Sequence, residues 1–482
     1  MKIKHSFNLF IFITAIFLGS CTIKNVPVAQ KNSIQLPNKF EIGGDSVIID
    51  SLRYERFFKD TVLINLINVA VQNNYDLKIA MQRVHIADAA ILARSGRLVP
   101  EVFAGAQAGA TRFGNYTIDG VGNYDTNFSE NIDDNQKIPY PVTPDFNFGL
   151  SSTWEIDIWN KLRTQKKGAY FSYLATDQGR KLIITQLVSR VANLYFDLLE
   201  RDNELKIVQN NIELQEKALE LVEIQKLAGR VTELAVKQFN AQLLNSRSLE
   251  FAIHQEIVEI ENALNLLLGR TPQNIERGVG ILEQELPDIN KTGIPSDLLL
   301  NRPDLKQLEY ELEASQANIY AARAAFYPSL RLNAFLGMEA FKPHLVFNPE
   351  SVAFNAMAGI TAPIFNRRGL KANFKRVQAE NYTLLYQYEQ ATLNAFSEVV
   401  TSLKGIDNST RLYELKALQV EELRKAVSTS NDLFLGGYAN YLEVVTAQKN
   451  VFEAELELMQ SRKNQFKYLI ELYRSLGGGW PE

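Results

Sequence analysis

Cysteine and histidine are scarce in this chain, and their scarcity excludes several kinds of chemistry. Among 482 residues there is one cysteine, so no disulfide can form within the chain. The four histidines (His5, His85, His254 and His344) are scattered, and none lies at metal-ligand spacing from other ligand residues. No phosphate-binding glycine loop and no nucleophile elbow occurs. We therefore expect a protein that is not an enzyme, with no catalytic residue and no metal site.

The chain also lacks an excess of charge of one sign and, beyond its N-terminus, any long apolar run. It has 51 basic and 55 acidic residues, so its formal net charge is −4. This balance gives no support for a nucleic-acid partner. After residue 20 there is no run of about 18 uncharged apolar residues, and we therefore expect no transmembrane helix in the mature chain.

The first 20 residues have the layout of a secretory signal. Two lysines and a histidine precede an apolar run over residues 7–18, which is too short to span a bilayer. The run ends in Leu-Gly-Ser before Cys21, and this resembles the lipobox of bacterial lipoproteins. We expect residues 1–20 to be a lipoprotein signal peptide, Cys21 to carry a covalent lipid as the only cofactor, and residues 21–60 to form a lipidated tail. The alternative is a cysteine that merely lies near an ordinary cleavage site.

The chain contains an internal repeat. Asn73–Gly109 aligns without a gap with Asn301–Gly337, and ten of the 37 positions are identical. A second match, from Gly229/Gly437 to Gly269/Gly477, follows at an offset of 208 instead of 228. Two matches in the same order predict a duplicated unit. We expect a first repeat over 61–272, an equatorial connector over 273–300 and a second repeat over 301–480.

Proline is absent between Pro144 and Pro272 and between Pro363 and Pro481. Both stretches are rich in Leu, Ala, Glu, Gln and Lys, which predicts long helices. Each stretch breaks once, at a glycine followed by a capping-type Thr or Asn, which predicts two antiparallel hairpins. The expected helices are 163–227 and 233–268 in the first repeat, and 370–434 and 441–475 in the second. Two shorter helices, 76–98 and 304–326, have the length needed to stack end to end with the short arms.

Apolar residues recur along both hairpins at alternating steps of three and four, which is the pattern of a coiled-coil seam. Eight of ten positions are apolar in a series over 187–219, and eight of ten in a series over 442–473. The exceptions in the two series are polar: Arg201, Gln215, Lys449 and Lys463.

Four segments alternate between two faces with the period of a β-strand. They are 102–111, 146–158, 330–338 and 354–364. Each is about as long as a strand that crosses a bilayer with one face toward lipid and the other toward water. The edge of a soluble β-sandwich is the alternative. Four strands cannot close a barrel, so several copies must assemble. The segment between the first two strands, about 111–145, is expected to be a polar loop on the outer face.

Several motifs resemble those of the outer-membrane efflux proteins, the TolC-type channel-tunnels, and in particular their lipidated OprM/NodT-like branch. Asn301-Arg302-Pro303-Asp304-Leu305 opens a helix, and the segment 321–330 closes it into a strand. Trp154–Trp159 marks a strand-to-helix corner, and Leu472–Trp480 ends the fold.

The resemblance implies an α+β membrane channel with four transmembrane strands and long coiled-coil helices per subunit. It further implies a homotrimer, in which a twelve-stranded β-barrel in the outer membrane continues as a twelve-helix α-barrel in the periplasm. The partners of such channels are membrane lipid, a periplasmic adaptor (membrane fusion protein) and an inner-membrane pump of RND or ABC type.

The family also implies an aperture at the periplasmic hairpin tips. After the second tip the family pattern is close to Tyr-Leu-Asp-x-x-Asp-Ala-Gln, and this chain has Tyr-Leu-Glu-Val-Val-Thr-Ala-Gln from residue 441. Leu442 fits the apolar constriction, Thr446 replaces the second acid, and Glu443 offers a displaced one. The expectation for Leu442 competes with a simple role in the seam. The tip residues expected to dock the adaptor are Gly229, Val231, Thr232, Gly437, Ala439 and Asn440.

We therefore expect a passive export duct for small toxic compounds, lipid-anchored in the outer membrane and extending into the periplasm. Two alternatives remain open at this point. One is a duct for type I protein secretion, and the other is a lipid-anchored periplasmic coiled-coil adaptor without a barrel.

Overall fold

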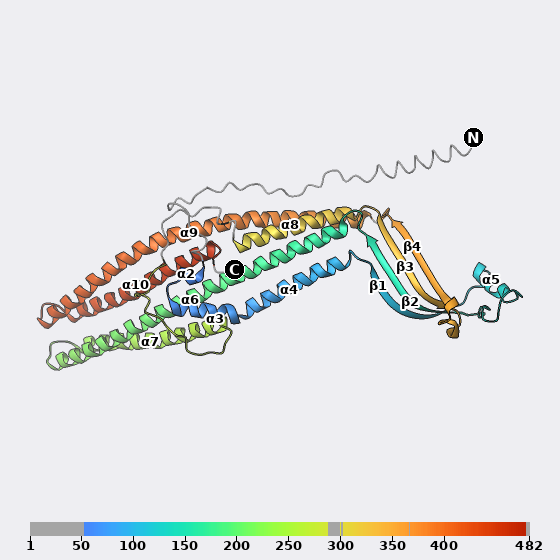
Figure 1. Cartoon of the computed structure of the whole chain (residues 1–482). Coiled ribbons are helices and arrows are strands. Elements are labelled where there is room, and N and C mark those ends of the chain that lie inside the picture. The colour runs from blue at the N-terminus through green and yellow to red at the C-terminus, as the bar shows by residue number, and fades with distance from the viewer. Residues whose placement is uncertain (1–52, 288–298, 300–301, 366, 479–482) are drawn as a thin grey trace, which may run out of the picture. The chain divides into compact units, whose positions relative to one another are not determined.

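A computed structural model describes residues 53–287, 299, 302–365 and 367–478 (Figure 1). The expected signal peptide, Cys21, most of the tail and part of the connector lie outside these residues. The described chain forms two compact units. One, which we call the sheet unit, contains His85–Leu174 and Tyr310–Leu385. The other, the hairpin unit, contains Ala175–Glu309 and the described parts of Asn32–Val84 and Tyr386–Glu482.

The sheet unit is built on four antiparallel strands in the order β1-β2-β3-β4 (Figure 1). The strands are β1 (Glu101–Thr111), β2 (Thr143–Ile156), β3 (Ser329–Ala340) and β4 (Val352–Thr361). Their register places residues of the same parity side by side across all four strands, so each face of the sheet has one composition. β1 and β4 are the edges of the sheet and have no strand partner on their outer sides within the described chain.

One face of the sheet is almost entirely apolar. This face carries the even-numbered residues of all four strands, such as Val102 to Ala110 on β1, Leu150 on β2, Leu336 on β3 and Phe354 on β4. Ser152 is the one residue with a hydroxyl group on this face. These side chains are not covered: Leu150 is 51% exposed, Leu336 58% and Phe354 81%. The opposite face carries mainly polar residues and glycines. A continuous exposed apolar face of this kind fits contact with lipid and not with water.

The strand ends differ from the expected ones for local reasons. β2 ends at Ile156 and not at 158, because the Asp157 carboxylate accepts the amide hydrogens of Leu162 and Arg163 and so caps the next helix. Asn160 adopts a positive φ of 55° in the same turn. β4 ends at Thr361 and not at 364, two residues before Pro363, which has no amide hydrogen to donate to a ladder.

The segment 111–145 is not simply a loop. It contains α5 (Ile118–Thr126), whose Tyr124 ring contacts the rings of Phe128 and Tyr140. Lys342, which follows β3, donates a hydrogen bond to the carbonyl oxygen of Asp134. The sequence gives no helical period strong enough to predict α5, because the helix is short and polar.

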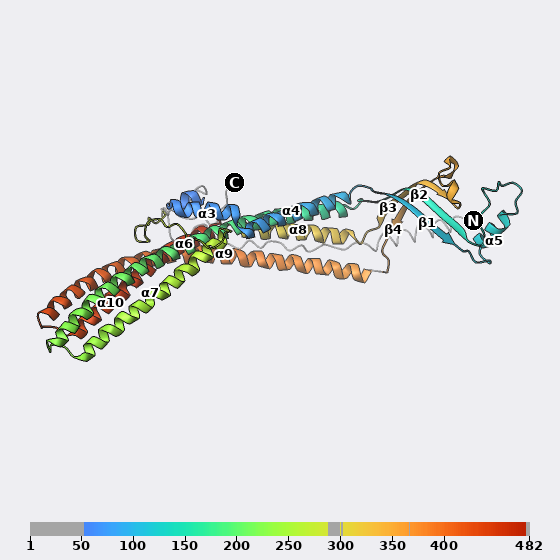
Figure 2. The same cartoon turned by 90° about the horizontal axis from the view of Figure 1, so that it is seen from below.

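Six long helices account for most of the remaining chain. Four helices contribute to both units: α4 (Tyr75–Gly96), α6 (Lys161–Leu227), α8 (Pro303–Ala324) and α9 (Arg367–Leu435). In the hairpin unit, α7 (Glu233–Leu267) returns along α6 and α10 (Tyr441–Ser475) returns along α9 (Figure 2). Surface ion pairs accompany both pairings, such as Arg247–Glu216 at 2.6 Å and Arg424–Glu455 at 2.6 Å.

The hairpin unit begins earlier in the chain than expected. α2 (Tyr54–Phe57) and α3 (Thr61–Asn73) belong to its core, so residues 54–60 are not a free tail. The Phe57 and Phe58 rings contact Tyr473, which is fully buried. Nearby, the rings of Phe196 and Phe466 stack with their centroids 4.1 Å apart. Aromatic burial of this size dominates the stability of a core.

Composition alone does not exclude a membrane-spanning helix, contrary to the expectation above. Among the described residues α6 contains one window that is long and apolar enough to cross a bilayer, and 61% of that window is buried inside the structure. The core helix of a soluble protein passes the same test, so this is weak evidence for a span. The apolar residues of α6 are accounted for by the core of the hairpin unit.

Two of the four polar interruptions of the apolar seams, Arg201 and Lys463, meet in one ionic network through Glu200. Arg201 on α6 pairs with Glu204 and, at 2.9 Å, with Glu256 on α7. Lys463 on α10 lies 2.7 Å from Glu200, which is 1% exposed. Burial raises the pKa of the Glu204 carboxyl, and the Arg201 guanidinium opposes that shift. The network therefore links the first hairpin to α10. Breaking one of its buried pairs would destabilise the fold, because it would leave an uncompensated buried charge.

The two repeats join their split helical columns at equivalent positions. Asn74, 4% exposed, donates from its side-chain amide to the carbonyl oxygen of Leu267 at 3.0 Å and accepts from the amide of Leu77. It thus caps the start of α4 and the end of α7 together. In the second repeat the guanidinium of Arg302 donates to the carbonyl oxygen of Ser475 at 2.9 Å. The two joints are equivalent in the repeat: the offset of 228 relates Asn74 to Arg302, and the offset of 208 relates Leu267 to Ser475.

Replacing Asn74 with alanine should destabilise the hairpin unit by about 1–2 kcal/mol, because one buried carbonyl loses its donor and one helix loses its cap. Thermal unfolding of the detergent-solubilised protein would measure the effect as a lower melting temperature. Asn210→Ala is the control, since Asn210 is exposed on α6 and that substitution favours the helix. Equal melting temperatures for Asn74→Ala and the control would contradict the joint.

Candidate functional site

The two hairpin tips are built alike. In the first, Gly229 takes a φ of 72° after α6, and in the second, Gly437 takes a φ of 79° after α9. An L side chain rarely adopts this conformation, so glycine ends each helix. A Cβ added at either glycine would meet no atom within 4 Å, so backbone conformation and not space selects the residue. The docking candidates Ala439 and Asn440 lie two and three residues after Gly437, and Val231 and Thr232 lie at the equivalent places after Gly229.

The caps of the two return helices differ. Asn440 accepts from the amides of Leu442 at 2.9 Å and Glu443 at 3.2 Å, which is a side-chain cap at the start of α10. Thr232 occupies the equivalent position before α7, but its side chain makes no cap hydrogen bond. The expectation that both residues cap alike is therefore wrong for Thr232. Glu233 compensates in part for the missing side-chain cap. The neighbouring ammonium groups of Lys226 and Lys237 lower the pKa of the Glu233 carboxyl, so this group stays charged at the positive end of α7.

The tips of one chain pack against each other. Val222 on α6 and Ala235 and Phe239 on α7 are buried in a small apolar cluster. Val231 from the first tip and Tyr441 and Val445 from the second pack onto it. This tip cluster lies beyond the main core, and it fixes the start of α10 against the first hairpin.

Leu442 lies away from the tip cluster. Its side chain is 53% exposed, whereas Val444, two residues on, is 3% exposed. The seam that was expected to start at Leu442 therefore begins instead with the buried Val444 and its neighbour Val445. Thr446 lies one turn after Leu442 on the same helix face and is also exposed. Within one chain this face is free to line an aperture.

Glu443 is exposed, and its carboxylate is held by a hydrogen bond. The side-chain amide of Asn440 donates to its Oε1 at 2.9 Å, while Asn440 accepts from the Glu443 amide. This reciprocal arrangement resembles a capping box. The carboxylate is thus held at the start of α10, about 100° around the helix from Leu442.

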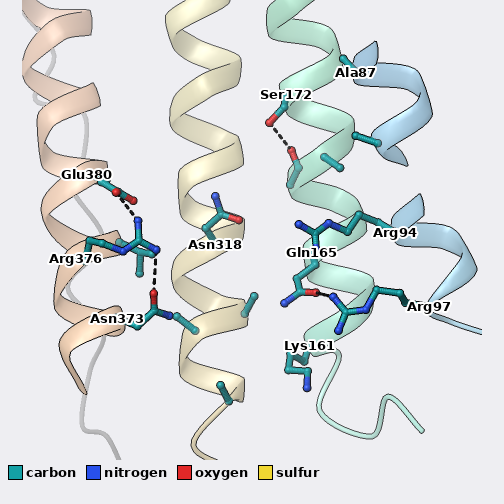
Figure 3. A pocket seen from close by; sticks show the side chains of 17 residues that line it. Ala87, Arg94, Arg97, Lys161, Gln165, Ser172, Asn318, Asn373, Arg376 and Glu380 are labelled. Carbon is teal, nitrogen blue, oxygen red and sulfur yellow. Dashed lines mark hydrogen bonds and ion pairs between the residues drawn. The ribbon is translucent and has the colours of Figure 1, made fainter. Parts of the chain in front are cut away.

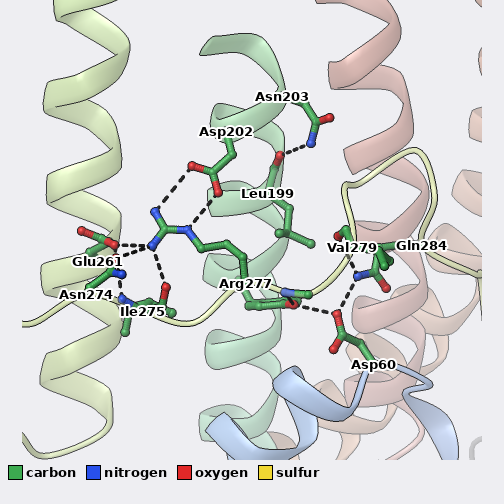
Figure 4. Close-up of polar contacts among 12 residues, drawn as sticks. Asp60, Leu199, Asp202, Asn203, Glu261, Asn274, Ile275, Arg277, Val279 and Gln284 are labelled. Carbon is green, nitrogen blue, oxygen red and sulfur yellow. Dashed lines mark hydrogen bonds and ion pairs between the residues drawn. The ribbon is translucent and has the colours of Figure 1, made fainter. Parts of the chain in front are cut away.

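A polar network at the connector was missed by the sequence reasoning (Figure 4). Tyr195 on α6 donates from its hydroxyl to Asp60 at 2.6 Å and accepts from the amide of Gly278 at 3.0 Å. Gln284 donates to the same carboxylate at 2.6 Å. Burial first, and then the hydrogen bond and charge of Asp60, raise the pKa of the Tyr195 hydroxyl well above its ordinary value. These contacts come from residues far apart in sequence, so no local motif indicates them.

Arg277 completes the attachment of the connector. It pairs with Asp202 on α6 at 3.0 Å and with Glu261 on α7 at 2.6 Å (Figure 4). The described part of the connector is therefore fastened across the first hairpin. Within the described ranges no group of three or more His, Cys, Asp or Glu residues could hold a metal ion.

Comparison with known proteins gives three concordant results. The family profile described as outer membrane efflux protein matches residues 66–270 and 294–478. The probable outer membrane lipoprotein SilC of Salmonella typhimurium is 27% identical over 476 residues, covering 98% of each chain. The toluene efflux pump outer membrane protein TtgI of Pseudomonas putida is 27% identical over 474 residues, covering 96% of this chain and 97% of that one.

The solved structures agree on the fold. The crystal structure of CusC, described in connection with transmembrane channel formation, has a TM-score of 0.81 and 26% identity, covering 94% of this chain and 99% of that chain. The fold is the channel-tunnel fold expected from the sequence motifs. These matches favour the channel over the alternative of an adaptor without a barrel.

Replacing Leu442 with serine should raise the leak conductance of the protein in a planar bilayer severalfold, because a hydroxymethyl group closes an aperture less tightly than an isobutyl group. Leu442→Met keeps an apolar side chain of similar volume and is the matched control. An unchanged leak for Leu442→Ser, with the same unitary conductance as the control, would show that Leu442 does not line the constriction.

Proposed function

Because the chain belongs to the outer membrane efflux protein family, we propose that it is the outer-membrane duct of a tripartite efflux system. It is a channel of the outer membrane, and it exports solute from the periplasm to the exterior. The single observation that carries this function best is the sheet with one exposed apolar face and two unpaired edges. The duct is passive: transport is driven by the pump that it serves.

The proposed assembly is a homotrimer. Each chain supplies four strands, and the edges β1 and β4 need partners because an unpaired edge is not tolerated in lipid. Pairing β4 of one copy with β1 of the next would close a barrel whose apolar face meets lipid and whose polar face lines the bore. Three copies would give twelve strands, which is the number implied by the resemblance to the family.

The proposed partners are a periplasmic adaptor and an inner-membrane pump of RND or ABC type. The tips after Gly229 and Gly437 are where an adaptor would dock, because they combine exposed loop residues with a fixed apolar base in the tip cluster. Leu442, Glu443 and Thr446 are proposed to line the aperture that docking opens.

The proposed cargo is a class of small toxic compounds. The related proteins range in name from a toluene efflux pump component to a cation efflux system protein and a pyoverdine export protein. These relatives have similar sequence identity to this chain but differ in the compounds that they are named for. This variety supports selection of the cargo by the pump and not by the duct. Type I protein secretion is the second candidate, and it would use the same duct.

The anchor proposed at Cys21 can be tested directly. Cys21→Ala should abolish incorporation of radiolabelled palmitate and should leave the protein with an unprocessed signal peptide, because the thiol is the acceptor of the lipid. Labelling in growing cells followed by immunoprecipitation measures both. A variant with Ser20 replaced by alanine keeps a small residue before the cysteine and should label normally. Undiminished labelling of Cys21→Ala would refute this anchor.

The duct itself is tested by reconstitution into a planar bilayer. We expect discrete conductance steps from the purified full-length protein. We also expect a higher open probability when the packing of the tip cluster is weakened. A protein that gives no conductance under any condition, and that stays monomeric in detergent, would exclude the duct.

A further inference from the structure

A large hollow lies on the sheet unit, among the membrane-proximal parts of four helices. It has a volume of about 600 Å³ and is bordered by α4, α6, α8 and α9 (Figure 3). Small residues, including Ala90, Ala169 and Ala322, line it together with several long polar side chains. Small residues create the hollow by leaving space where a larger side chain would fill it.

Two of the helices that border the hollow, α6 and α8, pack closely against each other. A Cβ placed on Gly168 of α6 would lie 3.4 Å from Cβ of Ala317 and 3.4 Å from the Asn318 amide oxygen, both on α8. The helices approach closely here because their facing residues are small. A neighbouring hydrogen bond, from Asn381 on α9 to the hydroxyl of Ser315 on α8 at 2.6 Å, fixes the next helix in the wall.

One residue that lines the hollow, Lys161, contacts the polar face of the sheet. Lys161, on its rim, forms an ion pair with Glu155 of β2. Glu155 lies on the polar face, opposite Arg331 of β3 in the strand register. In a closed barrel the apolar face meets lipid and the polar face lines the bore. In the proposed barrel the hollow would therefore belong to the inner wall of the tunnel.

Cationic side chains dominate the rim. Arg94, Arg97, Lys161 and Arg376 line the hollow, and Glu380 is the one carboxylate among its lining residues. Two of the four cations are neutralised: Arg376 pairs with Glu380, and Lys161 pairs with Glu155.

Arg94 and Arg97 are not neutralised. The Arg97 guanidinium donates to the neutral amide oxygen of Gln165 at 3.2 Å, and neither arginine forms an ion pair within the described residues. Both side chains lie along the α4 side of the hollow, toward the viewer's right in Figure 3. Each chain thus contributes two uncompensated positive charges to the wall.

We propose that this hollow, through Arg94 and Arg97, is an anion-attracting site on the inner wall of the duct, suited to solutes that carry carboxylate, phosphate or sulfonate groups. The proposal rests on the proposed function, because it needs the polar face to enclose a bore. Guanidinium groups bind such anions in a planar, bidentate geometry and cannot lose their charge at any physiological pH. Three copies would place six such groups around one level of the tunnel, and a bore walled by protein concentrates their field.

The test is the ion selectivity of single channels in a bilayer of phosphatidylcholine alone, with chloride as the anionic probe. A KCl gradient from about 10 mM to about 100 mM keeps the Debye length at about 10 Å or more, so the wall charges are felt in the bore. Replacing both arginines with glutamine should lower the chloride-to-potassium permeability ratio about threefold, read from the reversal potential. The double variant Arg94→Lys/Arg97→Lys keeps the charge and should keep the ratio of the unmodified protein.

The outcomes separate the two proposals. An unchanged ratio in the glutamine variant, with unitary conductance in concentrated KCl also unchanged, overturns the anion site while leaving the duct intact. A complete absence of conductance in the unmodified protein refutes the duct instead. A selectivity change that appears only when phosphatidylglycerol is added would assign the arginines to lipid headgroups and would also overturn the site in the bore.

Discussion

Every backbone amide and carbonyl that enters lipid needs a hydrogen-bond partner, because the hydrocarbon offers none, and this requirement governs the rest of the molecule. The chain brings four strands whose apolar face is exposed and whose outer edges, β1 and β4, are unpaired. In a single copy placed in lipid, the outward-facing amides and carbonyls of these two edge strands would have no hydrogen-bond partner. In the proposed assembly, several copies would close the sheet and its polar face would surround a bore.

The duplication shows how a wall of this kind is made from one repeated piece. Asn74 and Arg302 occupy equivalent positions and have the same role, since each fastens the start of one helix to the end of another. The residues differ, amide in one and guanidinium in the other, and Arg302 additionally pairs with Asp304 and Glu398. The copies are free to diverge where they are not joined, as at the caps of Thr232 and Asn440 and in the α5 segment.

Much of this architecture can be predicted from the sequence, because long helices and alternating strands depend on local periodicity. The long helices and all four strands lie within a few residues of their expected places. What depends on distant contacts cannot be predicted in this way. The period of α10 assigns Leu442 to the seam, yet only the packing of the first hairpin shows that Val444 is the buried residue. From the sequence, Arg201 and Lys463 are two separate interruptions of the seams, and only the fold joins them through Glu200. Arg94 and Arg97 stand out only in the fold, because neither forms an ion pair among the described residues.

The proposed duct depends on closure of the open sheet between copies of the chain. Native mass spectrometry of the full-length protein, extracted in mild detergent, tests this closure because it counts the chains in one particle. The account predicts a single dominant species of three mature, lipidated chains that persists on dilution. A stable monomer that keeps its strand content in the same detergent would contradict it.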